Sequence, residues 1–404
     1  MTEHVVMINS GKADALDALL RVAPRADVDV ITEKSYVAMY PAGTRLHLVE
    51  DIGRLDQVRE TALRLHRQPI SHVVGPSERS IQAAGYLRSF LGLPGIPYDV
   101  ANRMTNKAVM KGALAARGIA VAEHLSAVSG PGIVAAAEAL GWNVVVKPVL
   151  GTGSMNTFAL SGEAEVRRFV ASAQASTLTG ASCPVLVEKF VAMQAEYHVD
   201  AVVSGGEVLS ANVSRYLEPL LGHIADVSGS FTMPADDPRV SRLRALHQEV
   251  VTALGLGTGV THLEAYETEA GFLVGEIACR PGGGGIVDAV EMQTGVDLWR
   301  SFMETELGLP LTPPRPDPPH ADRLVVNLDL PIRPGRITRI SSAQELSGLD
   351  DLIRVDVRAS AGDRIGTRLH SSSATGFVFL AVTDPETAYL RAKELAVRFE
   401  LSVE

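Results

Sequence analysis

The sequence predicts an α/β protein with several units, and three observations support this prediction. Its 404 residues are long enough for two to four domains, at ~100–200 residues each. Apolar strand-like runs alternate with amphipathic helices at the start of the chain, a pattern typical of a parallel sheet with right-handed crossovers. Later, six prolines within residues 310–319 indicate a stiff, extended linker to a last unit.

The first part, residues 1–104, is expected to be a small α/β domain. Buried-strand runs are expected at residues 5–8, 27–31, 46–49 and 72–74. Apolar periodicity indicates helices between them, at residues 13–22, 55–66 and 78–91.

The middle part is expected to form two subdomains, residues 105–192 and 193–312. Helices are expected at residues 106–116 and 163–173, and strands at 144–149, 185–190 and 196–203. Two further strands, 259–266 and 271–277, should form a hairpin that turns at Glu269, Ala270 and Gly271.

The last part, residues 320–404, is expected to be a separate α+β unit of ~80 residues. Its strands are expected at residues 324–330, 353–358 and 376–382, before a helix over 385–399. This unit either closes one side of a site or makes a homodimer contact, and both alternatives remain open.

Composition excludes some classes of function. The net charge of -10 argues against a nucleic-acid binder, because such proteins need a basic face. Two cysteines, Cys183 and Cys279, are too few for a disulfide framework or a zinc site. The N-terminus lacks a basic, apolar leader, and no apolar run approaches the ~20 residues that span a membrane. We therefore expect a soluble cytoplasmic protein with no membrane contact.

The first chemical motif is a strand that ends in Lys147-Pro148 and is followed by a Gly/Ser-rich loop at residues 151–154. Glycines let backbone N–H groups approach phosphate oxygens, and a lysine adds positive charge. The spacing does not match a P-loop. Taken alone, a surface turn explains this motif better than a phosphate-binding loop does.

The second motif is a pair of short strands that holds residues 186–191 and 196–200. Their backbone could contact an adenine edge, and a carboxylate could bind a ribose diol. Taken alone, a plain hairpin with solvent-facing charges explains this segment better.

The third motif joins Thr261-His262-Leu263-Glu264 to the segment from Gly275 to Gly282. Strand alternation puts His262 and Glu264 on one face, and hairpin pairing would put Glu264 opposite Glu276. Two adjacent carboxylates repel unless a cation lies between them, and carboxylates suit Mg²⁺. Arg280 can then hold a transferring phosphate. Exposed acids in a hairpin explain the following glycines less well.

In this order, Lys107, Lys147-Pro148, residues 188–191, Glu196, Glu264 and Glu276-x-x-x-Arg280 resemble the ATP-grasp superfamily, and most closely its L-amino acid ligases and related carboxylate–amine ligases. The resemblance implies an ATP-grasp fold. A Rossmann-like domain would be followed by lid and central subdomains and a small C-terminal domain. It also implies an ATP- and Mg²⁺-dependent ligase, with Mn²⁺ as an alternative metal, that joins a carboxylate to an amine through an acyl phosphate. The expected substrates are small molecules, amino acids above all.

The resemblance also implies residue roles. Lys107 and Lys147 would contact the ATP phosphates, under a mobile loop formed by Gly151, Thr152, Gly153 and Ser154. Glu188 would bind the adenine amine, and the backbone of Lys189, Phe190 and Val191 would form the hinge. Glu264 and Glu276 would hold the metal, Arg280 would stabilise the transferred phosphoryl group, and His262 would lie near the substrate.

Two departures from the superfamily pattern are visible. Ala278 stands where many members have a metal-binding asparagine, which leaves the number of metal ions open. Glu196 is the expected ribose ligand, but its spacing from Glu188 is long, so His198 is an alternative. Residues 213–234 are expected to be a loop that shapes the substrate pocket, with Arg215 and His223 among its polar residues.

Three other functions remain as alternatives. One is a ligase of primary metabolism, either of the purine pathway or similar to biotin carboxylase. Another is an ATP-binding scaffold without catalysis, although such a scaffold would not need Lys147, Glu264, Glu276 and Arg280 together. Nucleic-acid binding is the weakest, given the acidic charge.

Overall fold

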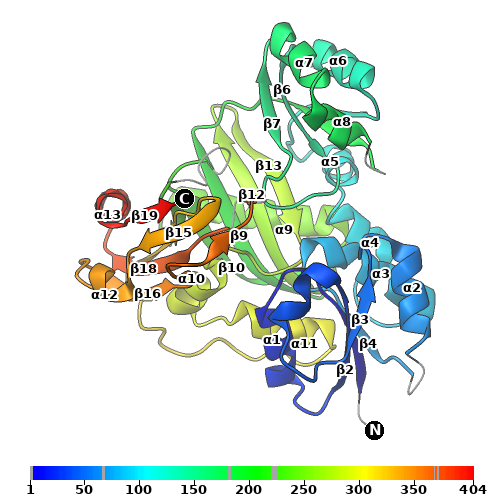
Figure 1. The fold of residues 1–404 in the computed structure, drawn as a ribbon, viewed down its shortest axis with the longest axis horizontal. Coiled ribbons are helices and arrows are strands. Elements are labelled where there is room, and N and C mark those ends of the chain that lie inside the picture. Colours follow the sequence, from blue (N-terminus) through cyan, green and yellow to red (C-terminus); the bar gives the residue numbers. More distant parts are fainter. Residues whose placement is uncertain (1–2, 66–68, 181–182, 220–225, 368, 371–372) are drawn as a thin grey trace.

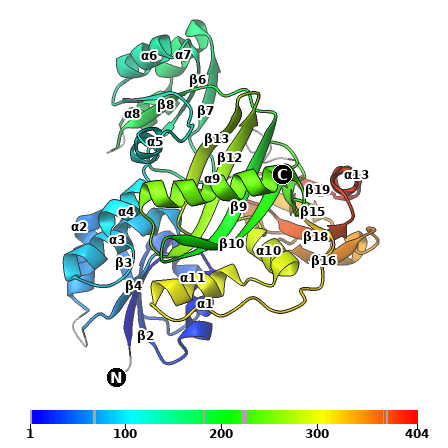
Figure 2. The ribbon, with the colours of Figure 1, turned by 180° about the vertical axis from the view of Figure 1, so that it is seen from behind.

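The computed structural model describes residues 3–65, 69–180, 183–219, 226–367, 369–370 and 373–404. Within these residues the strands form four sheets, of four, eight, three and four strands. The eight-stranded sheet lies at the centre, the N-terminal sheet lies on one side of it, and a small sheet with its own helices stands apart (Figures 1 and 2). The mixed α/β fold expected from the sequence is confirmed.

The N-terminal sheet is parallel and has the strand order β3-β2-β1-β4. Its strands lie close to the predicted positions: β1 His4–Ile8, β2 Asp27–Glu33, β3 Leu46–Val49 and β4 His72–Val74. The helical segments that connect or follow them are α1 Asp14–Val22, η1 Lys34–Met39, α2 Leu55–Leu63, α3 Glu78–Leu91 and α4 Tyr98–Arg103. All of β1 is buried, as expected for a strand with helices on both faces.

The central sheet is antiparallel and has the order β13-β12-β9-β10-β11-β14-β18-β16. Its first five strands are β9 Ala195–Ser204, β10 Glu207–Tyr216, β11 Ser228–Thr232, β12 Gly259–Thr268 and β13 Gly271–Ala278. The segment 213–234, which was expected to be a loop, contains the end of β10 and all of β11. His223 lies outside the described residues. The prediction was wrong because Tyr216 and Ser230, which made the segment look irregular, are buried in the wall of a cavity.

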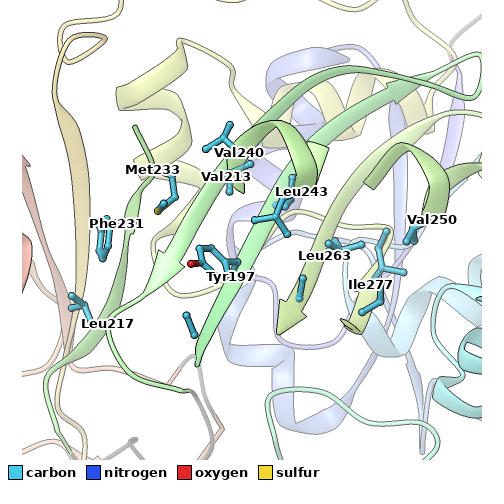
Figure 3. Packing of buried hydrophobic residues seen from close by; sticks show 14 of the residues in the cluster. Tyr197, Val213, Leu217, Phe231, Met233, Val240, Leu243, Val250, Leu263 and Ile277 are labelled. Atoms are coloured by element: carbon cyan, nitrogen blue, oxygen red, sulfur yellow. The ribbon is translucent and has the colours of Figure 1, made fainter. Parts of the chain in front are cut away.

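Helix α9 (Pro238–Leu254) covers the other face of the central sheet (Figure 2). Its apolar side packs on Tyr197, Leu263 and Ile277, and the same core continues to Phe231 (Figure 3). One face of each central strand is therefore fixed by apolar packing, which holds the residues of the opposite face in place.

The last part of the chain extends the central sheet. Strands β14 (Leu324–Leu330), β16 (Leu352–Val357) and β18 (Gly376–Val382) join it, and β14 pairs with β11. This part therefore shares its main sheet with the middle of the chain, although a separate unit was expected. A small sheet of its own has β15 Gly335–Ile340, β17 Arg364–Ile365 and β19 Leu401–Val403, beside helices α12 Ala343–Leu346 and α13 Pro385–Arg398.

The small outlying sheet has the order β5-β8-β6-β7. It contains β5 His124–Ala127, β6 Asn143–Pro148, β7 Phe158–Ser161 and β8 Val185–Lys189. Helices α6 Gly130–Ala139, α7 Glu163–Val170 and α8 Ala173–Thr179 pack on it and give it a separate apolar core. We call this unit, which stands apart from the other sheets, the lid sheet (Figure 1).

The remaining helices connect these sheets: α5 Lys107–Ala115, α10 Ile286–Thr294 and α11 Leu298–Glu306. Helix α11 packs against α1 and joins the N-terminal sheet to the middle of the chain. Among the described residues, every helix is too short or too polar to cross a bilayer.

The buried imidazole of His247 makes the stability of this core dependent on pH. His247 lies on α9 with no exposed surface, and its Nε2 is 2.8 Å from Thr261 Oγ1. Burial lowers the pKa of His247 to about 4. Because an unfolded histidine has a pKa of about 6.5, the folded protein binds fewer protons between these values. The free energy of unfolding should therefore have its full value above pH ~6.5. It should fall by about 3 kcal/mol as the pH drops toward 4.

Urea unfolding at about pH 7 and about pH 4.5 tests this prediction. His247→Gln keeps a hydrogen-bonding side chain beside Thr261 but cannot titrate in this range. The variant should therefore lose less stability on acidification than the wild type. An equal loss in both proteins would show that other groups cause the acid sensitivity.

Candidate active site

The residues predicted for the site line one cavity of about 780 Å³ between the lid sheet, the central sheet and the loops of the N-terminal sheet. All but one of the predicted residues are in its walls. They are Lys107, Lys147, Gly151, Thr152, Gly153, Ser154, Glu188, Lys189, Phe190, Val191, Glu196, His262, Glu264, Glu276 and Arg280. Residues that are up to about 170 positions apart in sequence thus meet in one place, and their roles remain predictions.

The β12–β13 hairpin places the two predicted metal ligands. The strands turn between Thr268 and Gly271, and Glu264 pairs directly with Glu276 in the register, as the sequence predicted. A bulge follows Glu264, and both carboxylates keep about a fifth of their side-chain surface exposed toward the cavity. Two opposed carboxylates with open oxygens form a suitable donor set for a hard cation such as Mg²⁺.

Lys107 stands beside these carboxylates. It is the first residue of α5, which Asn106 caps by accepting the N–H groups of Ala108 and Val109. Its ammonium lies 3.1 Å from Glu276 Oε2 and donates to the carbonyl of Gly151, 2.8 Å away. Burial opposes this charge, but the nearby carboxylates, Glu276 first, outweigh burial and raise the pKa of Lys107. The lysine therefore carries a fixed positive charge against the Gly/Ser loop.

Glu188 lies between two lysines. Its two oxygens are 3.0 Å from Lys147 Nζ and 3.3 Å from Lys111 Nζ, and all three side chains are buried. Burial alone would raise the pKa of Glu188, but the two ammonium groups lower it. Lys111 was not among the residues predicted for the site. Its position one helical turn after Lys107 was the available signal, because residues four apart lie on the same helix face.

The predicted adenine hinge follows β8, where the chain leaves the lid sheet. Phe190 is 48 % exposed and lines the cavity together with Val191, while its N–H donates to the carbonyl of Asn143. The Gly/Ser loop joins β6 to β7, and Gly153 and Ser154 both have positive φ, at 61° and 56°. This backbone turns N–H groups in directions that regular strands do not allow, as anion-binding loops do.

Arg280 makes an ion pair that the sequence analysis missed. Its Nε donates to Glu78 Oε2 over 3.0 Å, and its Nη1 donates to the carbonyl of Pro281. Glu78 is the first residue of α3 and is buried, and its pKa is raised by burial in spite of the guanidinium. A carboxylate just after the carboxyl end of β4 was a usable signal, because ligands bind at that edge of parallel sheets.

Behind the cavity wall, Asp200 bridges two histidines. Its oxygens lie 2.9 Å from His262 Nδ1 and 2.6 Å from His198 Nδ1. Although burial opposes protonation of His262, Asp200 raises its pKa to about 9. Among the described residues, the ligand atoms of these three side chains lie close enough together to hold a metal ion. However, the atoms that would bind the ion already contact one another. The network instead holds His262 with Nε2 3.6 Å from Glu264.

The structure does not bring His198 into the cavity lining. Its second nitrogen, Nε2, is 2.9 Å from Ser230 Oγ, so both ring nitrogens face protein groups and its surface is 1 % exposed. The ribose role suggested for His198 is therefore not supported, and Glu196, which does line the cavity, keeps it as a prediction.

Arg215 was named among the polar residues of the segment expected to shape the substrate pocket, and the structure places it outside the cavity lining. It pairs with Tyr197, whose side chain belongs to the core beneath α9, so alternation directs Arg215 away from the cavity. The next residue, Tyr216, lines the cavity instead and is buried.

Comparisons with known proteins agree with this geometry. Residues 330–404 match the family described as L-amino acid ligase C-terminal domain 2. The chain is 31% identical over 380 residues to an L-arginine-specific L-amino acid ligase of Bacillus subtilis, which covers 91% of this chain and 90% of that protein. It is 24% identical over 249 residues to the carbamoyl phosphate synthase large chain of Streptomyces avermitilis, covering 60% of this chain and 22% of that one.

Solved structures show the same fold. An L-amino acid ligase from Bacillus licheniformis superimposes with a TM-score of 0.75 at 19% identity, over 100% of this chain and 99% of that one. A carboxyaminoimidazole ribonucleotide synthase from Aspergillus clavatus, complexed with ATP, gives 0.71 at 16% identity over 98% of both chains. The fold is thus that of ATP-grasp ligases, and the chain belongs to the L-amino acid ligase family, whose members are ATP-dependent carboxylate–amine ligases.

Proposed function

We propose that this protein joins two amino acids through an amide bond, using ATP to activate the carboxylate of one of them. The observation that carries the proposal is the meeting of Lys107, Glu264, Glu276 and Arg280 in one cavity. Lysine, two carboxylates and an arginine supply the charges that phosphoryl transfer to a carboxylate needs. Family membership supports the same reaction class and small-molecule substrates.

For ATP, we propose that the adenine lies against the hinge at residues 189–191 and the phosphates lie near Lys107 and Lys147. The Gly/Ser loop between β6 and β7 would cover the phosphates with backbone N–H groups. Because Lys147 forms an ion pair with Glu188, Glu188 would hold this lysine near the phosphates. Glu188 would also contact the adenine base. Neighbouring structures that contain ATP or ADP support nucleotide binding in this fold.

Glu264 and Glu276 are the residues that would hold Mg²⁺, with Mn²⁺ as the alternative. Their opposed carboxylates, open to the cavity, fit a hard divalent cation, and Ala278 adds no further donor. When bound, such an ion would neutralise charge on the phosphate oxygens.

In the reaction we propose, an oxygen of the substrate carboxylate attacks the γ-phosphorus of ATP, and ADP leaves. The amine of the second substrate then attacks the acyl carbon, loses a proton, and phosphate leaves. Arg280 would contact the transferred phosphoryl oxygens, held in position by Glu78. His262, fixed by Asp200, would keep the Glu264 carboxylate oriented. Closure of the lid sheet would exclude water, which otherwise hydrolyses the acyl phosphate.

The proposal is tested by incubating the protein with ATP, Mg²⁺ and pooled amino acids, while measuring phosphate release and condensation products by mass spectrometry. Phosphate release tied to a dipeptide mass is the expected result. Nucleotide binding without hydrolysis in any mixture would favour a non-catalytic scaffold. Phosphate release only with a purine-pathway amine or bicarbonate would favour the ligases of primary metabolism.

We also propose a cytoplasmic location, where ATP and amino acids are available. The free thiols of Cys183 and Cys279 are compatible with a reducing compartment.

A further inference from the structure

One carboxylate of the cavity has an oxygen with no hydrogen-bond partner among the described residues. Asp329 lies on β14 and lines the cavity, and its Oδ1 is buried without a hydrogen bond. Burial raises the pKa of Asp329 well above its usual range, and no charged side chain among the described residues opposes that shift. A carboxylate oxygen that is buried without a partner destabilises the protein unless something pairs with it.

Five other acids of this region face a cation or a titratable donor, which distinguishes them from Asp329. The pairs are Glu78 with Arg280, Glu276 with Lys107, Glu188 with Lys147 and Lys111, Glu264 with His262, and Asp200 with two histidines. Each of these paired acids has its partner within the site described above. The Oδ1 atom of Asp329 has no such partner among the described residues, so we expect a ligand to supply it.

The surroundings of Asp329 belong to the substrate side of the cavity. Asn327, two residues earlier on the same strand face, also lines the cavity, and its Oδ1 has no hydrogen-bond partner. Its Nδ2 donates to the carbonyl of Gly284, in the glycine segment that follows Arg280. Tyr216 lines the same cavity, and its pKa is raised first by burial and then by nearby carboxylates that include Asp329. None of these neighbours belongs to the lid sheet, which holds the predicted adenine hinge.

We propose that Asp329 binds an N–H cation of the amino acid substrate, either the guanidinium or ammonium of a basic side chain or the α-ammonium group. This inference rests on the proposed function. A carboxylate beside a neutral amide acceptor suits a group with several N–H donors, because each oxygen can accept one. A metal ion would require more anionic ligands than this single carboxylate. Asp329 would then be a determinant of substrate specificity.

Binding measurements with four ligands separate the two sources of the cation and do not depend on catalysis. Calorimetric titrations would use arginine, citrulline, 4-guanidinobutanoate and pentanoate with the protein, Mg²⁺ and a non-hydrolysable ATP analogue. Citrulline has only the α-ammonium, 4-guanidinobutanoate has only the guanidinium, and pentanoate has neither. Asp329→Asn should weaken binding of the ligands that carry the recognised cation by about 10- to 100-fold, and leave pentanoate unchanged.

The set of ligands that bind the variant more weakly identifies the cation. If only arginine and 4-guanidinobutanoate lose affinity, Asp329 binds the side-chain cation. If only arginine and citrulline lose affinity, Asp329 binds the α-ammonium group. The inference is overturned if the wild type binds no cationic ligand, if Asp329→Asn changes every affinity by less than about threefold, or if pentanoate loses as much as the others.

Two controls keep the result interpretable. Asp329→Asn replaces a carboxyl group whose buried oxygen has no hydrogen-bond partner among the described residues, so its Tm should equal or exceed that of the wild type. Asp322→Asn, at an exposed carboxyl just before β14, should bind all four ligands like the wild type. If charge-dependent binding is observed but no amide product forms with any substrate, the proposed function fails while this inference stands.

Discussion

Replacing Glu276 with glutamine should abolish product formation, with kcat reduced about 1,000-fold or more. Glutamine keeps the shape of the side chain but cannot balance a divalent cation together with Glu264, which lies opposite it. It also removes the partner of the Lys107 ammonium, 3.1 Å away. The loss should therefore combine weaker metal binding with loss of the Lys107 ion pair, and it is measured as the rate of ADP and amide formation.

Glu269→Gln is the matched control, because Glu269 is exposed at the turn of the same hairpin. It should retain wild-type kcat. Circular dichroism and thermal unfolding should show that Glu276→Gln is still folded, since Lys107 retains its bond to the Gly151 carbonyl. A folded Glu276→Gln variant with kcat within about threefold of the wild type would contradict the assignment.

Arg280→Lys should reduce kcat by about 100- to 1,000-fold while the KM for ATP changes little. Lysine retains the positive charge, so buried Glu78 keeps a counter-ion and the fold is preserved. The substitution removes the planar guanidinium, whose several N–H donors can bind Glu78 and a phosphoryl oxygen at the same time. A selective effect on kcat indicates an interaction made in the transition state.

Steady-state kinetics with varied ATP and varied amino acid measure this split. Arg167→Lys, at an exposed ion pair with Glu163 on α7, is the control and should be kinetically silent. A rise in the KM for ATP with unchanged kcat would place Arg280 in nucleotide binding instead.

Local patterns predicted several parts of the fold. Strand alternation and a short turn were sufficient for the β12–β13 hairpin and for the pairing of Glu264 with Glu276. Alternating strands and helices were sufficient for the parallel N-terminal sheet. These features depend on residues close in sequence, where the period of apolar positions determines the structure.

The features that were missed depend on distant contacts. Glu78 and Arg280 are 202 residues apart, and nothing in either local sequence specifies the other. Strand β14 joins the central sheet through β11, although the proline-rich segment before it suggested a separate unit. The end of β10 and all of β11 were assigned to a loop because the composition of residues 213–234 is irregular, and the burial of Ser230 follows from its place in the cavity wall.

The central claim is that ATP phosphorylates a substrate carboxylate. An amino acid labelled with ¹⁸O in its carboxyl group, incubated with the enzyme, ATP, Mg²⁺ and an acceptor amine, tests it most directly. The account predicts ADP as the nucleotide product and one ¹⁸O atom transferred to each phosphate released with the amide. Unlabelled phosphate, or AMP and pyrophosphate in place of ADP and phosphate, would contradict it.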